Sequence, residues 1–170
     1  YKDMRVLITG SSGQLGQTIA ELLLPKHDII GVDLRSSNVT THVGSVGNRE
    51  LIFNLVKDVD AVIHTASLHA PHVGQFTKEQ FIDTNIKGTL NLLEASVAHK
   101  IRRLVYTSTT SLYGFAMVPR HKAMWVTEEL TPRPRDIYDI TKLAAEQLCE
   151  HFASAFCLPI ICLRTSRFWN

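Results

Sequence analysis

The feature that most constrains the fold is a glycine-rich turn between an apolar run and a helix-like run. The apolar run is Met4 to Ile8, and the turn reads Thr9-Gly10-Ser11-Ser12-Gly13-Gln14-Leu15-Gly16. Gly10 lets the chain leave a strand in a conformation that a Cβ would hinder, Gly13 lets the backbone approach a phosphate, and Gly16 lets a helix pack closely on a sheet. Unpaired N–H groups at the start of that helix favour an anion. The turn therefore predicts a binding site for the pyrophosphate of a dinucleotide.

An acidic residue stands where such a site needs one. A second apolar run from Ile29 ends at Asp33, whose carboxylate can accept hydrogen bonds from ribose hydroxyls and would repel a 2′-phosphate. We therefore expect NAD as the cofactor, with NADP less favoured. Arg35 either reaches a phosphate or faces solvent. The alternative, a glycine turn that binds nothing, is disfavoured because a strand, a helix and an acid surround the turn at the required spacing.

Strand-like and helix-like runs alternate along the chain, with no internal repeat. The expected strands are 4–8, 29–33, 41–44, 60–65, 103–107 and 160–163, and the expected helices are 14–24, 49–56, 78–99 and 137–156. The apolar faces of the first and third helices should include Leu15, Ile19, Leu22 and Leu23, and Phe81, Ile82, Ile86, Leu90, Leu93 and Val97. This order predicts an α/β fold, a Rossmann doubly wound parallel sheet in three layers, with 1–170 as one domain. The polar stretch 109–136 follows a strand, so we expect it to line a cleft at the carboxyl edge of the sheet.

Composition excludes several classes of function. A hydrophobic content of 45% suits a folded domain, and a net charge of +2 is too small to indicate nucleic-acid binding. No apolar stretch approaches the roughly 20 residues of a membrane span, so we expect no membrane partner and a cytoplasmic location.

Cysteines and histidines give little indication of a metal. Cys149, Cys157 and Cys162 are odd in number and lack a C-x-x-C spacing, so we expect reduced, buried thiols. His64 ends a strand and His69 and His72 follow it without carboxylates at suggestive spacing, although their loop can line a ligand cleft. We predict no metal site.

Tyr138 and Lys142 are the residues best suited to proton transfer. They are four residues apart near the start of a predicted helix, so their side chains share one face. A cation beside a phenol lowers the pKa of the phenol, which makes a base near neutral pH. Hydroxyl-bearing residues at the end of the preceding strand, Thr107 to Ser111, could bind the same substrate oxygen. The alternatives are a solvated Tyr/Lys pair and an ordinary polar turn.

Several segments carry a resemblance to a known family. They are Thr9 to Gly16, Asp33, Asp60 to Ala66, Asn85 to Ala95, Tyr106 to Gly114, Tyr138 to Lys142 and Leu163-Arg164. With these motifs in this order, the chain resembles the extended short-chain dehydrogenases/reductases of the NAD-dependent epimerase/dehydratase family. The resemblance implies hydride transfer at a secondary alcohol of a sugar-like or nucleotide-sugar substrate, and a possible homodimer formed through a four-helix contact of 78–99 and 137–156.

The resemblance also implies roles for individual residues. Thr109 would be the catalytic hydroxyl, Tyr138 the acid/base, and Lys142 the residue that lowers the pKa of Tyr138 and binds the nicotinamide ribose. Asn85 would mainly hold the sheet and helix in place. The residues expected at the cofactor are Gly10, Ser12, Gly13, Gln14, Leu15, Gly16, Asp33, Leu34, Arg35, Ser45, Val46, Thr65, Ala66, Ser67, Asn85, Thr107, Ser108, Tyr138 and Lys142.

The chain also departs from the family pattern. Gly44-Ser45 replaces a usual Gly-Asp, and 165–169 replaces an aromatic residue and an asparagine. Family members are about twice as long, so we expect the substrate-binding C-terminal portion to lie outside this chain. Two other functions remain open: a non-catalytic dinucleotide sensor or scaffold of the same fold, and a Rossmann-like methyltransferase, which would have no use for the Tyr/Lys pair.

Overall fold

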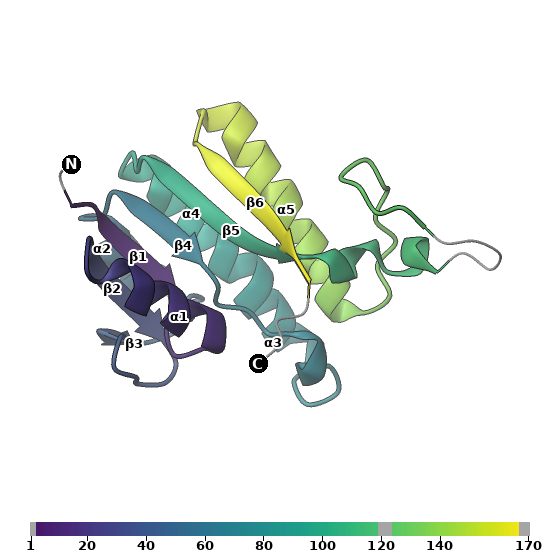
Figure 1. Ribbon diagram of the computed structural model, residues 1–170, viewed down its shortest axis with the longest axis horizontal. Coiled ribbons are helices and arrows are strands. Elements are labelled where there is room, and N and C mark those ends of the chain that lie inside the picture. The colour runs from purple at the N-terminus through teal and green to yellow at the C-terminus, as the bar shows by residue number, and fades with distance from the viewer. Residues whose placement is uncertain (1–2, 119–123, 167–170) are drawn as a thin grey trace.

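The sheet is fully parallel, as the alternating pattern predicts. The computed structural model of the protein describes residues 3–118 and 124–166. Six strands pair in the order β3-β2-β1-β4-β5-β6 (Figure 1). They are β1 (Arg5–Thr9), β2 (Asp28–Asp33), β3 (His42–Val43), β4 (Ala61–His64), β5 (Arg103–Thr109) and β6 (Ile160–Thr165). The order reverses between β1 and β4, and ligands of open α/β sheets bind at such a reversal.

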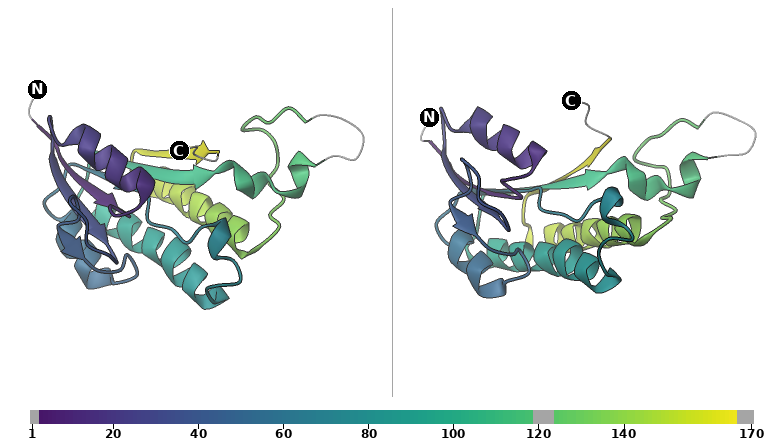
Figure 2. Two further views of the ribbon diagram at one scale, coloured as in Figure 1. Left: turned by 60° about the horizontal axis from the view of Figure 1, so that its bottom comes forward. Right: turned by 90° about the horizontal axis from the view of Figure 1, so that it is seen from below.

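Helices cover both faces of the sheet, which confirms the doubly wound three-layer fold. They are α1 (Gln14–Leu23), α2 (Arg49–Val56), α3 (Lys78–Phe81), the π-helical segment η2 (Ile82–Lys87), α4 (Gly88–Ala98) and α5 (Ile137–Phe156). Helix α1 lies on one face, and α2, α4 and α5 lie on the other (Figure 2). This division follows from right-handed crossovers, because the chain moves one way from β1 to β2 and the other way from β3 to β4, β5 and β6.

Successive residues of a strand point to opposite faces of the sheet and pack into two separate hydrophobic cores. In β1, Val6 and Ile8 pack beneath α1, whereas Leu7 belongs to the larger core under α2, α4 and α5. A strand buried on both faces needs apolar residues at successive positions, and β1 has them. The carboxyl ends of β1, β4 and β5 therefore meet at one edge, supported by packing on both sides.

Two predicted apolar positions are wrong. Leu22 is 72% exposed, because Gly16 and Ala20 form the buried face of α1. Ile82 is 46% exposed, because the helix widens into a π-helical turn that buries Phe81 and Asn85 instead. The predicted continuous helix 78–99 is thus three consecutive segments, and a π turn of this kind leaves no clear trace in apolar spacing.

The stretch after β5 extends from the body of the fold (Figure 1). It begins with two 3-10 turns, η3 (Thr110–Tyr113) and η4 (Phe115–Met117). Gly114 has φ of 51°, and Phe115 N donates to the carbonyl of Arg133 at 2.9 Å, which ties the two ends of the stretch together. Residues 119–123 lie outside the described ranges. Across the described part of the chain, no helix has the length and apolar character of a membrane span.

Candidate active site

Two adjoining cavities open at the carboxyl edge of the sheet, one of about 460 Å³ and one of about 560 Å³. They share Thr65, Ser67 and His69 as a common wall. From the predicted set, the smaller cavity is lined by Gly10, Asp33, Leu34, Arg35, Ser45, Val46, Thr65, Ala66 and Ser67, and the larger by Gln14, Leu15, Gly16, Thr65, Ser67, Thr107, Ser108, Thr109, Tyr138 and Lys142. The fold therefore brings most of the predicted residues into one continuous groove.

The glycine turn has the geometry that its sequence predicts. Gly10 has φ of 72°, and a Cβ there would come within 2.7 Å of the backbone nitrogen of Ala66. A Cβ on Gly16 would overlap the carbonyl oxygen of Gly10. Gly13 occupies the N-cap of α1 and has no side chain to cap the helix. The start of α1 thus presents backbone N–H groups at the groove, where an anion would be stabilised.

Asp33 is held in a fixed orientation at the end of β2. Its Oδ2 accepts a hydrogen bond from Ser12 N at 3.0 Å, and its Oδ1 accepts one from Arg35 N at 3.2 Å. Each carboxylate oxygen keeps a further lone pair for a ligand hydroxyl. The buried hydroxyl of Ser108, which lines the larger cavity, has no hydrogen-bond partner among the described residues. Groups of this kind fit a dinucleotide, which offers phosphate and ribose oxygens as partners.

Tyr138 and Lys142 face the larger cavity from the first turns of α5. Asp136 begins this helix by accepting a hydrogen bond from Asp139 N at 3.0 Å. Tyr138 and Thr109 both line this cavity. Lys142 Nζ donates to the carbonyl of Thr107 at 2.6 Å. The end of β5 and the start of α5 therefore place a hydroxyl, a phenol and an amine around one space.

The expected lowering of the Tyr138 pKa is wrong for the protein alone. Burial raises the pKa of Tyr138, and the neighbouring hydroxyl of Thr109 opposes this only in part. Burial also lowers the pKa of Lys142 from 10.5 to about 7, although the carboxylate of Glu146 acts in the opposite direction. Removal of water is thus the largest influence on the pKa of both groups, and the carboxylates of Asp139 and Asp136 raise the pKa of Tyr138 further.

Three of the predicted cofactor residues do not line either cavity: Ser12, Gly13 and Asn85. Asn85 is buried in the π-helical segment, where its amide donates to the carbonyl of Leu68 and to Thr141 Oγ1, each at 3.0 Å. Its Oδ1 accepts from Leu68 N at 2.8 Å. Asn85 thus fastens the loop after β4 to α5, in keeping with the holding role that the resemblance implies.

His64 is part of a buried hydrogen-bond chain. Its Nδ1 lies 2.6 Å from Thr9 Oγ1 and its Nε2 lies 3.0 Å from Thr89 Oγ1. Thr89 gives its hydroxyl proton to the carbonyl of Asn85, so Nε2 of His64 must donate and Nδ1 must accept. Burial lowers the pKa of His64 to about 3, and Lys142 adds to the effect. Within the described ranges, no group of three or more His, Cys, Asp or Glu residues is placed to hold a metal ion.

Two further groove residues, His69 and Arg135, lie in segments predicted to line a cleft but were not predicted individually as site residues. His69 lines both cavities, with its ring centroid 6.3 Å from that of Tyr138. Arg135 lines the larger cavity and is paired with buried Asp139 at 3.2 Å. The only signal for His69 is its place in the loop after β4. Two thiols also differ from expectation, because Cys157 and Cys162 are exposed and only Cys149 is buried.

The fold and the groove together define a dinucleotide-binding protein of the short-chain dehydrogenase/reductase class. Residues 6–168 match the profile of the NAD dependent epimerase/dehydratase family, and the chain belongs to that family. The expected cofactor, NAD, is the one that the family's description names.

Individual relatives agree with this assignment. The chain is 30% identical to an uncharacterised UDP-glucose epimerase of Bacillus subtilis, over 95% of this chain and 55% of that protein. It is 26% identical to a dTDP-D-glucose 4,6-dehydratase of Dictyostelium discoideum, over 98% of this chain and 44% of that protein. The crystal structure of a Thermus thermophilus UDP-glucose 4-epimerase in complex with NAD matches with a TM-score of 0.82 and 28% identity, over 95% of this chain and 54% of the epimerase. The chain thus spans about half the length of these relatives.

Proposed function

We propose that residues 1–170 are the NAD-binding, catalytic part of an enzyme that transfers a hydride at a secondary alcohol of a nucleotide sugar. The observation that carries the proposal is that Thr109, Tyr138 and Lys142 line one cavity of a groove that continues to the glycine turn and Asp33. The substrate class rests on relatives that include epimerases and a dehydratase of nucleotide sugars. Residues that select the sugar would lie largely in a portion beyond this chain.

The chain's own residues supply binding and proton transfer. NAD, when bound, would accept the hydride that leaves the substrate carbon. Tyr138 would take the proton of the reacting hydroxyl, and Thr109 would hold the substrate oxygen against the phenol. Lys142 would stabilise the phenolate and donate to a ribose hydroxyl. Asp33 would bind the ribose of the adenosine, and the start of α1 would bind the pyrophosphate.

The test is turnover of UDP-glucose and dTDP-glucose by the protein at its natural length, with NAD affinity measured by calorimetry on the same variants. We expect Tyr138→Phe to lower kcat roughly 1000-fold and Thr109→Val to lower it roughly 100-fold, since general acid–base catalysis contributes on this scale. NAD affinity should change little. Tyr113→Phe is the matched control, because this phenol bonds to Thr127 and Arg164 and lines neither cavity of the groove.

The same measurements separate the competing functions. A sensor or scaffold would bind NAD and turn over neither sugar, and Tyr138→Phe would then change nothing that is measured. A methyltransferase would bind S-adenosylmethionine in preference to NAD. Either result would refute the catalytic proposal.

A homodimer and a cytoplasmic location stay predictions. Helices α4 and α5 pack side by side on one face of the sheet (Figure 2), and α5 exposes 51% of Ile140 there. A dimer through these helices would cover that side chain. Light scattering on wild type and Ile140→Glu tests the contact, since a monomeric wild type would contradict it.

A further inference from the structure

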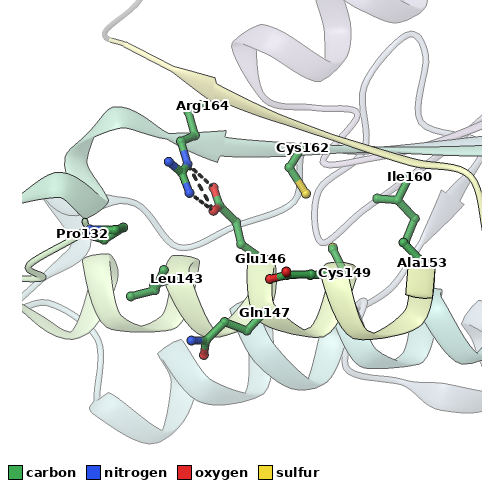
Figure 3. Close-up of a pocket in the computed structure, with 10 residues that line it drawn as sticks. Pro132, Leu143, Glu146, Gln147, Cys149, Ala153, Ile160, Cys162 and Arg164 are labelled. Carbon is green, nitrogen blue, oxygen red and sulfur yellow. Dashed lines mark hydrogen bonds and ion pairs between the residues drawn. The ribbon is translucent and has the colours of Figure 1, made fainter. Parts of the chain in front are cut away.

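A third cavity, of about 350 Å³, lies between α5 and the edge strand β6, away from the groove. Figure 3 shows side chains of the helix and of the strand facing one another across it. Glu146 and Arg164 form an ion pair at 2.7 Å at one end. Its lining residues are Pro132, Leu143, Glu146, Gln147, Cys149, Glu150, Ala153, Ile160, Cys162 and Arg164.

The register of helix and strand places two cysteines opposite each other. Strand residues point to the same side at every second position, so Cys162 faces α5 together with Arg164. Helix residues three apart share a face, so Cys149 lies one turn beyond Glu146. The helix α5 and the strand β6 run in opposite directions. One step from the ion pair Glu146–Arg164, Cys149 on the helix therefore lies opposite Cys162 on the strand. Both cysteines line the cavity between the helix and the strand.

We propose that Cys149 and Cys162 are a redox pair that closes to an intrachain disulfide when the protein meets a peroxide. The proposal is independent of the proposed function, because neither thiol lines the groove. The bond would join the middle of α5, the helix that carries Tyr138 and Lys142, to the last strand of the sheet.

The two thiols differ in the way that such chemistry needs. Cys162 is exposed, and the neighbouring thiol of Cys149 lowers the pKa of Cys162, with Arg164 and Lys142 acting in the same direction and burial and Glu146 opposing them. Cys149 is buried, and both the neighbouring thiol of Cys162 and burial raise the pKa of Cys149. Cys162 is thus the thiolate that meets an oxidant, and Cys149 is the thiol held ready beside it.

The reaction balances in two steps. The thiolate of Cys162 attacks one oxygen of the peroxide and the O–O bond breaks, so Cys162 becomes a sulfenic acid. The second oxygen leaves as hydroxide or alkoxide and takes a proton from solvent to become water or an alcohol. The sulfur of Cys149 then attacks the Cys162 sulfur, its proton goes to the departing hydroxide, and water leaves as the S–S bond forms. The pair loses two electrons and the peroxide gains them.

The experiment treats the reduced protein with a small excess of hydrogen peroxide and measures intact mass, using Cys157→Ser to remove the third thiol. We expect the mass to fall by two hydrogen atoms and dithiothreitol to restore it. Trypsin leaves both cysteines on one peptide, but a glutamate-specific protease cleaves after Glu146 and Glu150 and separates them. The two fragments should remain joined until reduction. The disulfide should raise Tm by about 5 °C, because it removes conformational freedom from the unfolded chain.

Controls distinguish this outcome from general oxidation. Cys149→Ser in the same background should gain oxygen at Cys162 and lose no hydrogen, and circular dichroism checks that it folds. In the wild type, exposed Cys157 reports that the peroxide dose was sufficient. Two free thiols at Cys149 and Cys162 after Cys157 has reacted would overturn the proposal. Stable oxyacid at Cys162 beside a free Cys149 would also overturn it.

Discussion

Lys142 Nζ donates a hydrogen bond of 2.6 Å to the carbonyl oxygen of Thr107, which fastens the first turns of α5 to the end of β5. The same amine lies 4.3 Å from the ring centroid of Tyr106, whose aromatic face favours a cation. Only 4% of Lys142 is exposed, so these two contacts replace the water that an ammonium ordinarily has. The contacts hold the amine in place beside the groove, and burial brings its pKa to about 7.

A first prediction concerns stability at alkaline pH. The pKa of Lys142 is about 7 in the folded protein and 10.5 in its ordinary state, so the folded chain binds fewer protons than the unfolded chain between these values. The contribution of Lys142 to the free energy of unfolding therefore rises with pH through this window, by roughly 1.4 kcal/mol per pH unit. Lys142→Met should remove this component from urea unfolding curves measured across the window. Parallel pH profiles for the two proteins would contradict the prediction.

A second prediction concerns acid. Burial lowers the pKa of His64 from 6.5 to about 3, so the unfolded chain binds the extra proton first as pH falls. The contribution of His64 to the free energy of unfolding is fully present above about pH 6.5 and falls by roughly 1.4 kcal/mol per pH unit toward pH 3. His64→Gln should lose less stability over this range. Nitrogen NMR should find the Nε2–H tautomer of His64 at neutral pH, and the Nδ1–H form would refute the hydrogen-bond chain.

A third prediction separates two glycines of the same turn. A Cβ on Gly13 would lie 3.2 Å from the carbonyl oxygen of Gly10, which a small shift relieves, whereas a Cβ on Gly16 would overlap that oxygen. Gly16→Ala should therefore cost about 2 kcal/mol or more of stability, because backbone must move to accommodate it. Gly13→Ala should keep Tm within a few degrees and weaken NAD binding, since the proposed function places the pyrophosphate at the start of α1, where Gly13 is the N-cap. Equal loss of stability in both variants would count against this assignment.

A fourth prediction concerns the choice of cofactor. Asp33→Asn removes the charge that would repel a 2′-phosphate. It also replaces one carboxylate oxygen with an NH₂ group, so either Ser12 N or Arg35 N loses its hydrogen-bond acceptor. We expect NAD to bind about 10-fold more weakly and the preference over NADP to shrink, in line with the loss of a charged hydrogen bond. Calorimetry with both dinucleotides measures the change. Arg35→Gln is the control, and tighter NADP than NAD binding by the wild type would defeat the prediction.

Much of the fold follows from local sequence. The apolar run of β1, the glycine turn and Asp33 each carry their own steric or electrostatic requirement, so their places in the structure could be predicted without knowledge of distant contacts. The strand alternation likewise predicts the sheet, with bounds that shift by one or two residues.

The sequence-based predictions fail for features that depend on contacts between distant parts of the chain. Tyr138 has a cation one turn away, yet burial by residues from other elements controls its pKa. His69 reaches the groove because of the path that the loop takes after β4, which periodicity does not encode. Cys162 is exposed because β6 is the edge strand of the described sheet, a consequence of strand order.

The π-helical turn at 82–87 has an implication for insertions and deletions in this helix. At its end, Gly88 N donates to the carbonyl of Asp83, five residues back, so the turn holds one residue more than an α-helix would at this point. Removal of Asp83 would let ordinary four-residue hydrogen bonds close and leave the helix unbroken on both sides. Asn85 would then lose its hydrogen bonds to Leu68 and Thr141, because these bonds depend on the wider turn. A shortened chain of this kind would keep its helix content and lose the link between the loop after β4 and α5.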